Sequence, residues 1–187
     1  MIIETEQSPR SKRGKETMFR VTYRNQTSLR QIVDSKANMI ISINTLIISS
    51  IIAISGYGIV SDKIDLYMKN IMPIAVIVVS CLVSAVFAIL AANPRFIRPK
   101  VEKPKDKQSL LFFGEMAEHS QEEYLQKMEE LLTSREDIYR NMIIDLHYQG
   151  IILKFKFRYI SFAYNILMIG FSLGVIFYLV FLFFQYE

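Results

Sequence analysis

The sequence has few of the residue types that build most active sites. It contains one cysteine, two histidines and no tryptophan. Cys81 alone cannot form an internal disulfide, and no histidine has partners at the spacing of a zinc or redox motif. The sequence also has no glycine-rich phosphate loop, no nucleophile elbow and no His-Glu-x-x-His pattern. We therefore expect neither an enzyme nor a bound cofactor or metal.

Charge is absent from three long stretches. Residues 37–61, 70–94 and 159–186 contain no Asp, Glu, Lys or Arg over 25, 25 and 28 residues. Roughly 20 apolar residues in a helix cross the hydrocarbon core of a bilayer. A soluble protein would instead carry charges along one face of its helices. The sequence predicts an all-α integral membrane protein with three transmembrane helices in these stretches.

The charges between these stretches predict the orientation of the chain. Residues 1–36 have eight basic and four acidic side chains, residues 95–110 have six and two, and the loop 62–69 has two of each. Positively charged segments next to a span stay in the cytoplasm. We expect residues 1–36 and 95–158 to be cytoplasmic, and the loop 62–69 and the C-terminus to be external.

An acidic segment follows the basic linker. Residues 111–149 contain nine carboxylates against three basic side chains. Ser120 and Glu123 form a capping-box pattern, and a second cap signal lies at residues 133–137. Each is followed by an apolar stripe at helical spacing, and we expect Gly150 to end the second. The sequence predicts a cytoplasmic helical pair whose stripes favour a homo-oligomer.

A metal site is the alternative for the start of this segment. Four side chains there could approach a metal ion by proximity in sequence: Glu115, Glu118, His119 and Glu122. Acidic residues are favoured near the positive end of a helix dipole, so a solvated helix start explains them better.

Two further segments connect to the spans. No proline interrupts the passage from the N-terminal segment into the first span, so we predict one helix from about Gln26 to about Ser55. Basic and aromatic residues alternate over residues 154–159, which suits the headgroup interface before a span. The same alternation is also typical of a β-strand, which is the alternative here.

The first span is unusually polar. It contains Asn38, Ser42, Asn44 and Thr45, whereas the second and third spans are expected to face lipid in the ordinary way. An amide in hydrocarbon is costly unless it is hydrogen-bonded, so Asn44 should face another helix or a water-filled path. These four residues are candidates for helix packing or for a gate.

The basic residues after the second span are the candidate phosphate ligands. Arg95, Arg98 and Lys100 could contact the phosphate of a nucleotide, because guanidinium groups hold phosphate oxygens in a bidentate manner. Contact with anionic lipid headgroups is the alternative for the same residues.

Several short elements occur in a distinctive order from residue 19 to the last span. They are Phe19-Arg20, Asp34-Ser35-Lys36-Ala37-Asn38, Ile41-Ser42-Ile43-Asn44, Arg98-Pro99-Lys100, Leu111-Phe112-Phe113-Gly114, Glu123-Tyr124, Ile138-Tyr139 and Gly150. In this order the chain resembles the transmembrane effector domain of Pycsar antiphage systems, over about residues 17–184.

The resemblance implies a multi-pass effector in the bacterial inner membrane. Such a protein is silent until a partner cyclase makes a cyclic nucleotide, specifically a cyclic pyrimidine mononucleotide, during phage infection. It then compromises the membrane and stops growth or kills the cell. No nucleic-acid partner is implied. Because the sequence has no separate cyclic-nucleotide-binding domain, the site is expected in residues 94–158, at a subunit interface or in a partner protein.

Two other functions fit the same residues. A non-toxic membrane scaffold would recruit a soluble partner through the acidic helices and use the polar residues of the first span for packing. A constitutive channel subunit fits less well, because no charged residue inside the spans marks an ion path.

Overall fold

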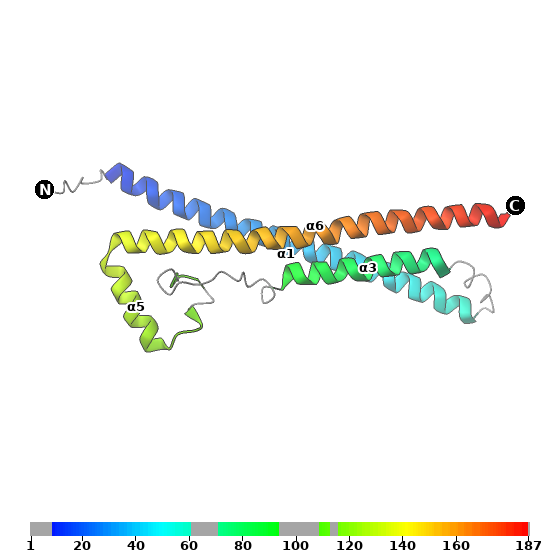
Figure 1. Cartoon of the computed structure of the whole chain (residues 1–187), viewed down its shortest axis with the longest axis horizontal. Coiled ribbons are helices and arrows are strands. Elements are labelled where there is room, and N and C mark those ends of the chain that lie inside the picture. Colours follow the sequence, from blue (N-terminus) through cyan, green and yellow to red (C-terminus); the bar gives the residue numbers. More distant parts are fainter. Residues whose placement is uncertain (1–8, 61–70, 94–108, 113–115, 187) are drawn as a thin grey trace. The chain divides into compact units, whose positions relative to one another are not determined.

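The computed structural model describes residues 9–60, 71–93, 109–112 and 116–186 (Figure 1). Within them lie the helices α1 (Pro9–Val60), α3 (Ile71–Ala92), α5 (Gln121–Thr133) and α6 (Arg135–Tyr186). Helices α1, α3 and α6 are each long and apolar enough to cross a membrane. The described part of the chain is helical and contains no strand, which confirms the predicted all-α class with three candidate spans.

The chain divides into two compact units, and α1 and α6 contribute to both. The first unit comprises Met1–Arg30 and Pro99–Leu153, and the second comprises Gln31–Arg98 and Lys154–Glu187. The first unit therefore contains α5 and the opening turns of α1 and α6. The second contains α3 and the most apolar parts of α1 and α6.

In the first unit, α1 and α6 run in the same direction. The rings of Phe19 and Tyr139 stack with centroids 5.5 Å apart, and further along both helices Gln26 Nε2 donates to the Leu146 carbonyl at 3.2 Å. Because later residues of α1 meet later residues of α6, the two helices are parallel here. Parallel packing gives the unit one continuous seam between elements about 120 residues apart in sequence.

A short segment of residues 109–112 docks on α6 in the same unit. Asn141 accepts hydrogen bonds from Ser109 Oγ at 3.2 Å, through its carbonyl, and from the Leu110 backbone N–H at 3.0 Å, through its side chain. Phe112 also packs against the Tyr148 ring. These contacts hold Leu111 beside the α1 and α6 seam.

In the second unit, α3 runs opposite to α6. Ser84 contacts Ala163, and earlier in α3 Ser80 lies against Gly170, which is later in α6. A Cβ atom built on Gly170 would overlap the Oγ and Cβ atoms of Ser80, and one on Gly174 would overlap Ile77 Cγ1. The two glycines therefore let α3 approach α6 more closely than any other residue would allow.

The ends of the helices confirm one expectation from the sequence and correct three others. The capping box at Ser120 is confirmed, with Ser120 Oγ accepting from the Glu123 N–H and the Glu123 carboxylate accepting from the Ser120 N–H. The prediction that Gly150 ends a helix is wrong, because α6 continues through it to Tyr186 as one helix of 52 residues. The alternative strand at residues 154–159 is wrong for the same reason. Helix α1 begins at Pro9 and not near Gln26.

A single glycine stops a helix only weakly. It costs about 1 kcal/mol relative to alanine inside a helix. At Gly150 the backbone lies beside Gln26 Nε2 of α1, at van der Waals distance from where a Cβ would stand. Packing along the seam therefore outweighs the propensity of one residue, and the residues expected to form a second, separate helix belong to α6.

Candidate functional site

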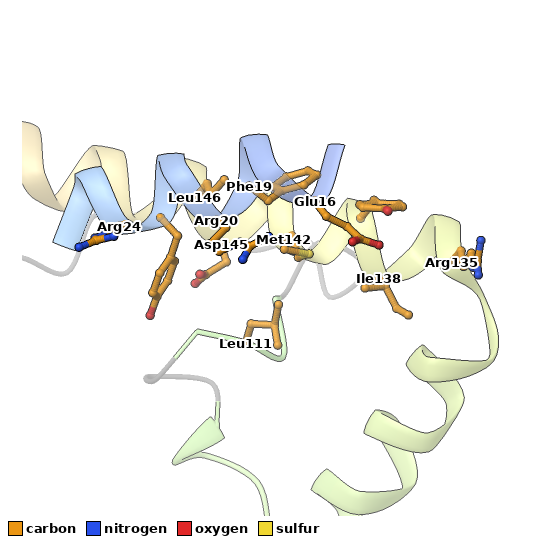
Figure 2. Close-up of a pocket in the computed structure, with 12 residues that line it drawn as sticks. Glu16, Phe19, Arg20, Arg24, Leu111, Arg135, Ile138, Met142, Asp145 and Leu146 are labelled. Atoms are coloured by element: carbon orange, nitrogen blue, oxygen red, sulfur yellow. The ribbon is translucent and has the colours of Figure 1, made fainter. Parts of the chain in front are cut away.

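A groove of about 760 Å³ lies in the first unit, between α1, α6 and Leu111 (Figure 2). Its α1 wall includes Phe19, Arg20 and Arg24. Its α6 wall includes Arg135, Ile138, Tyr139, Met142, Asp145 and Leu146. This volume is within the range of pockets that bind small molecules.

Aromatic rings form much of the apolar wall. Phe19 is buried and stacks on Tyr139 with an angle of 22° between the rings. Tyr23, one turn further along α1, is 53% exposed and also lines the groove. Such rings offer flat surfaces on which another planar group can stack.

Three guanidinium groups give the groove a positive rim. Arg20, Arg24 and Arg135 line it and are all exposed, with Glu16 as the opposing charge. Among the residues that the structure describes, none forms an ion pair or hydrogen bond with these three arginines. Their donors are therefore available to a ligand.

Asp145 is the buried charged residue of the groove. Its residue is 5% exposed, and its Oδ2 atom accepts a hydrogen bond from Gln149 Nε2 at 2.6 Å. Its Oδ1 atom accepts none from the described residues. Burial raises the pKa of Asp145, and this outweighs the Gln149 hydrogen bond and the charge of Arg30, which both lower it. Asp145 precedes the uncharged stretch 159–186, so its carboxyl group is not in the part of α6 that is expected to cross the membrane.

We expect Asp145→Asn to stabilise the first unit at neutral pH. A carboxyl whose pKa is higher in the folded than in the unfolded state contributes most to stability below its ordinary pKa of about 4. That contribution is lost as the pH rises through the raised value, so the ionised residue is unfavourable at pH 7. Thermal midpoints in detergent between pH 4 and 8 should fall with pH in the wild type and less steeply in the variant. Parallel pH profiles would contradict this assignment.

A second polar cluster joins the three apolar helices in the second unit. Asn44 is fully buried, and its Nδ2 atom donates to Ser84 Oγ of α3 at 3.1 Å. Ser84 Oγ in turn donates to the Ala163 carbonyl of α6 at 2.8 Å. The Asn44 Oδ1 atom accepts no hydrogen bond from the described residues. The amide predicted to face another helix does so, and it makes one of its four possible hydrogen bonds with the described residues.

The other candidate gate residues do not join this cluster. Asn38, Ser42 and Thr45 are exposed. Ser42 Oγ donates to the Asn38 carbonyl and Thr45 Oγ1 to the Ile41 carbonyl, so both hydroxyls are satisfied within α1. The candidate phosphate ligands Arg95, Arg98 and Lys100, like the loop 62–69, lie outside the described residues.

One ion pair links α1 to α6 just before their uncharged stretches. Lys156 Nζ donates to Asp34 Oδ1 at 2.5 Å, and the Lys156 side chain is 4% exposed whereas that of Asp34 is 41% exposed. The buried ammonium therefore has a half-exposed carboxylate as its counter-charge. The described residues contain no cluster of three His, Cys, Asp or Glu side chains that could hold a metal ion.

The family model of the Pycsar effector protein domain matches residues 17–184. The chain belongs to this family. No curated protein and no solved structure matches the chain. Membership of the Pycsar effector family implies an antiphage defence effector that acts with cyclic nucleotide signalling and is associated with a membrane.

Sequence reasoning missed two features of this Pycsar effector. The close approach of α3 and α6 at Gly170 and Gly174 could have been found, because two glycines four residues apart in an apolar helix are a known packing signal. The third span is therefore more than an ordinary lipid-facing helix. The groove had no local signal, since its two walls are far apart in sequence.

Proposed function

We propose that this Pycsar effector compromises the bacterial inner membrane and stops growth when a cyclic nucleotide from a partner cyclase reaches it during phage infection. In this proposal residues 1–36 and 95–158 are cytoplasmic, the loop 62–69 and the C-terminus are external, and α5 with the start of α6 forms the cytoplasmic helical pair. The first unit then faces the solution in which the nucleotide is made.

The polar cluster around Asn44 is the observation that carries the proposal. A polar atom without a partner is expensive in hydrocarbon, yet Asn44 Oδ1 lies among three apolar helices and accepts no hydrogen bond from the described part of the chain. A different packing that hydrates or bonds this oxygen would recover part of that cost. This oxygen therefore makes the observed packing of the three apolar helices less stable, and a rearrangement that pairs or hydrates it is favoured by that amount.

The long helices supply a physical link for the signal. A ligand shifts a conformational equilibrium only by the difference in its affinity for the two states. Helices α1 and α6 have 52 residues each and contribute to both units. A ligand that favours one packing of their first turns therefore acts on the same helices that form the membrane part.

Self-association is part of the proposal. Helix α5 buries Leu131, but Leu125 and Leu132 on the same helix are 52% and 62% exposed. A second copy of the chain would cover such apolar side chains, and several copies would be needed to surround a path for ions. We propose a homo-oligomer in the membrane.

The test is permeability of cells that express the effector with its cognate cyclase. We expect potassium loss and dye entry only when both proteins are present, and we expect Asn44→Leu to abolish them. Thr45→Val is the matched control, because the Thr45 hydroxyl is exposed and bonded within its own helix. If cells that express the wild-type effector with an active cyclase keep their permeability and growth unchanged, the proposal is wrong.

A scaffold is the second candidate function. The exposed leucines of the acidic helix α5 favour it, because they offer an apolar surface with negative charges around it. A scaffold would tolerate Asn44→Leu or gain stability from it, and its expression with the cyclase would leave the membrane intact. If the wild type damages cells and Asn44→Leu does not, the membrane-damaging function is supported. If neither damages cells, the scaffold is supported.

A further inference from the structure

We propose that the groove between α1, α6 and Leu111 binds a nucleotide, with Arg20 and Arg24 contacting the phosphate and Asp145 accepting a hydrogen bond from an N–H of the base. That the nucleotide is a cyclic mononucleotide rests on the proposed function. The location and the chemistry of the site rest on the groove alone.

The arginines fit a phosphate. Arg20 and Arg24 are one turn apart on α1, so both side chains leave the same face of the helix and both line the groove. A guanidinium offers parallel N–H donors that match phosphate oxygens, and these two have no competing carboxylate partner among the described residues. Arg135 adds a third positive charge from α6.

The aromatic wall fits a base. The exposed ring of Tyr23 lies in the same groove as the arginines, together with the Phe19 and Tyr139 rings, which stack on each other. Bases of all kinds stack on such rings because each has a π face. A groove that combines flat apolar walls with guanidinium groups suits a ligand that is planar at one end and anionic at the other.

Asp145 favours a ligand that carries a hydrogen-bond donor. The residue is 5% exposed and lines the groove, and its Oδ1 atom has no hydrogen-bond partner among the residues that the structure describes. Figure 2 shows its side chain on the same side of the two helices as that of Arg20. A buried acceptor without a partner is costly, so a ligand that donates to it gains affinity. A carboxylate repels the negative charge of inorganic phosphate, so phosphate makes this contact less well than the neutral N–H groups of a nucleobase.

This site differs from the one that the sequence suggested. The candidate ligands there were Arg95, Arg98 and Lys100 in the linker. The groove instead uses α1 for the phosphate and α6 for the base, so it needs both helices to be packed as observed.

Binding to the full-length protein in nanodiscs tests the site. The probes are cyclic CMP, cyclic UMP, cyclic AMP and inorganic phosphate, titrated by calorimetry. We expect Arg20→Gln with Arg24→Gln to weaken binding of the preferred cyclic nucleotide by at least about tenfold, because two charge-assisted contacts are lost. Arg13→Gln and Arg140→Gln, exposed arginines that do not line the groove, should change it by less than about twofold.

Asp145→Asn separates recognition of the base from recognition of the phosphate. An amide can still accept a hydrogen bond but is a weaker acceptor than a carboxylate, so we expect weaker nucleotide binding. Inorganic phosphate should bind equally well or more tightly, because a negative charge is removed from the groove. Nucleotide affinity that is unaffected by the arginine substitutions, a wild type that binds none of the nucleotides, or phosphate that binds as tightly as they do would overturn the assignment.

The outcomes distinguish this site from the proposed function. If the wild type binds a cyclic nucleotide through the groove but cells with the cyclase stay intact, the site stands and the membrane-damaging function fails. If cells are damaged and the Arg20 and Arg24 variants respond as the wild type does, the function stands and the groove is not the site.

Discussion

Gly170→Ala is expected to destabilise the protein by about 1–3 kcal/mol, because the new Cβ would overlap the Oγ and Cβ atoms of Ser80. The overlap involves the first atom of the Ser80 side chain, so the α3 backbone has to move. Gly174→Ala approaches only Ile77 Cγ1 and Cδ1 closely, while Ile77 Cβ lies at ordinary contact distance, so less movement of the α3 backbone is needed and the cost should be smaller.

Unfolding in mixed micelles with increasing dodecyl sulfate measures these changes. Gly56→Ala is the matched control, since a Cβ there meets no described residue within 4 Å and alanine is the better helix former. This control should be neutral or stabilising by up to about 1 kcal/mol. Equal free energies of unfolding for Gly170→Ala and the wild type would mean that α3 and α6 do not pack closely.

The second large effect is expected at the Asp34 and Lys156 ion pair. Asp34→Asn removes the counter-charge and leaves the Lys156 ammonium buried, which should destabilise the protein by about 1–3 kcal/mol. The value stays below that of a fully buried pair because Asp34 is partly exposed and solvent screens its charge.

A double substitution tests whether the pair itself is responsible. Asp34→Asn combined with Lys156→Met removes both charges and should recover most of the lost free energy of unfolding, because no unpaired charge remains. Lys154→Met serves as the control for hydrophobicity, since Lys154 is exposed on the same helix. If the double variant is no more stable than Asp34→Asn, the two residues do not interact.

Features set by neighbouring residues could be predicted from the sequence. The capping box needs only Ser120 and Glu123, three residues apart, and the structure contains it as expected. The three uncharged stretches likewise predict three helices of sufficient length, because each stretch carries its own evidence. Asn44 could be expected to bond to another helix from the cost of an amide in hydrocarbon alone.

Features that depend on distant residues could not be predicted. Asp34 and Lys156 are 122 residues apart, and one sequence does not say which lysine meets which aspartate. The extent of α6 depends on its seam with α1, which outweighs the weak stop signal of Gly150. The groove is the clearest case: Phe19-Arg20 and Ile138-Tyr139 are among the elements that suggested the family, yet only the fold places them together.

The length of α1 and α6 has a mechanical consequence. At 1.5 Å per residue, a helix of 52 residues is about 78 Å long, whereas the hydrocarbon core is about 30 Å thick. Each helix thus continues its regular backbone hydrogen bonding well beyond the thickness of one bilayer. Because the uncharged stretch forms the C-terminal part of both helices, this extra length precedes it. In the proposed function, a change in the packing of the first turns can therefore reach the uncharged stretch through unbroken helix, with no separate linker to order.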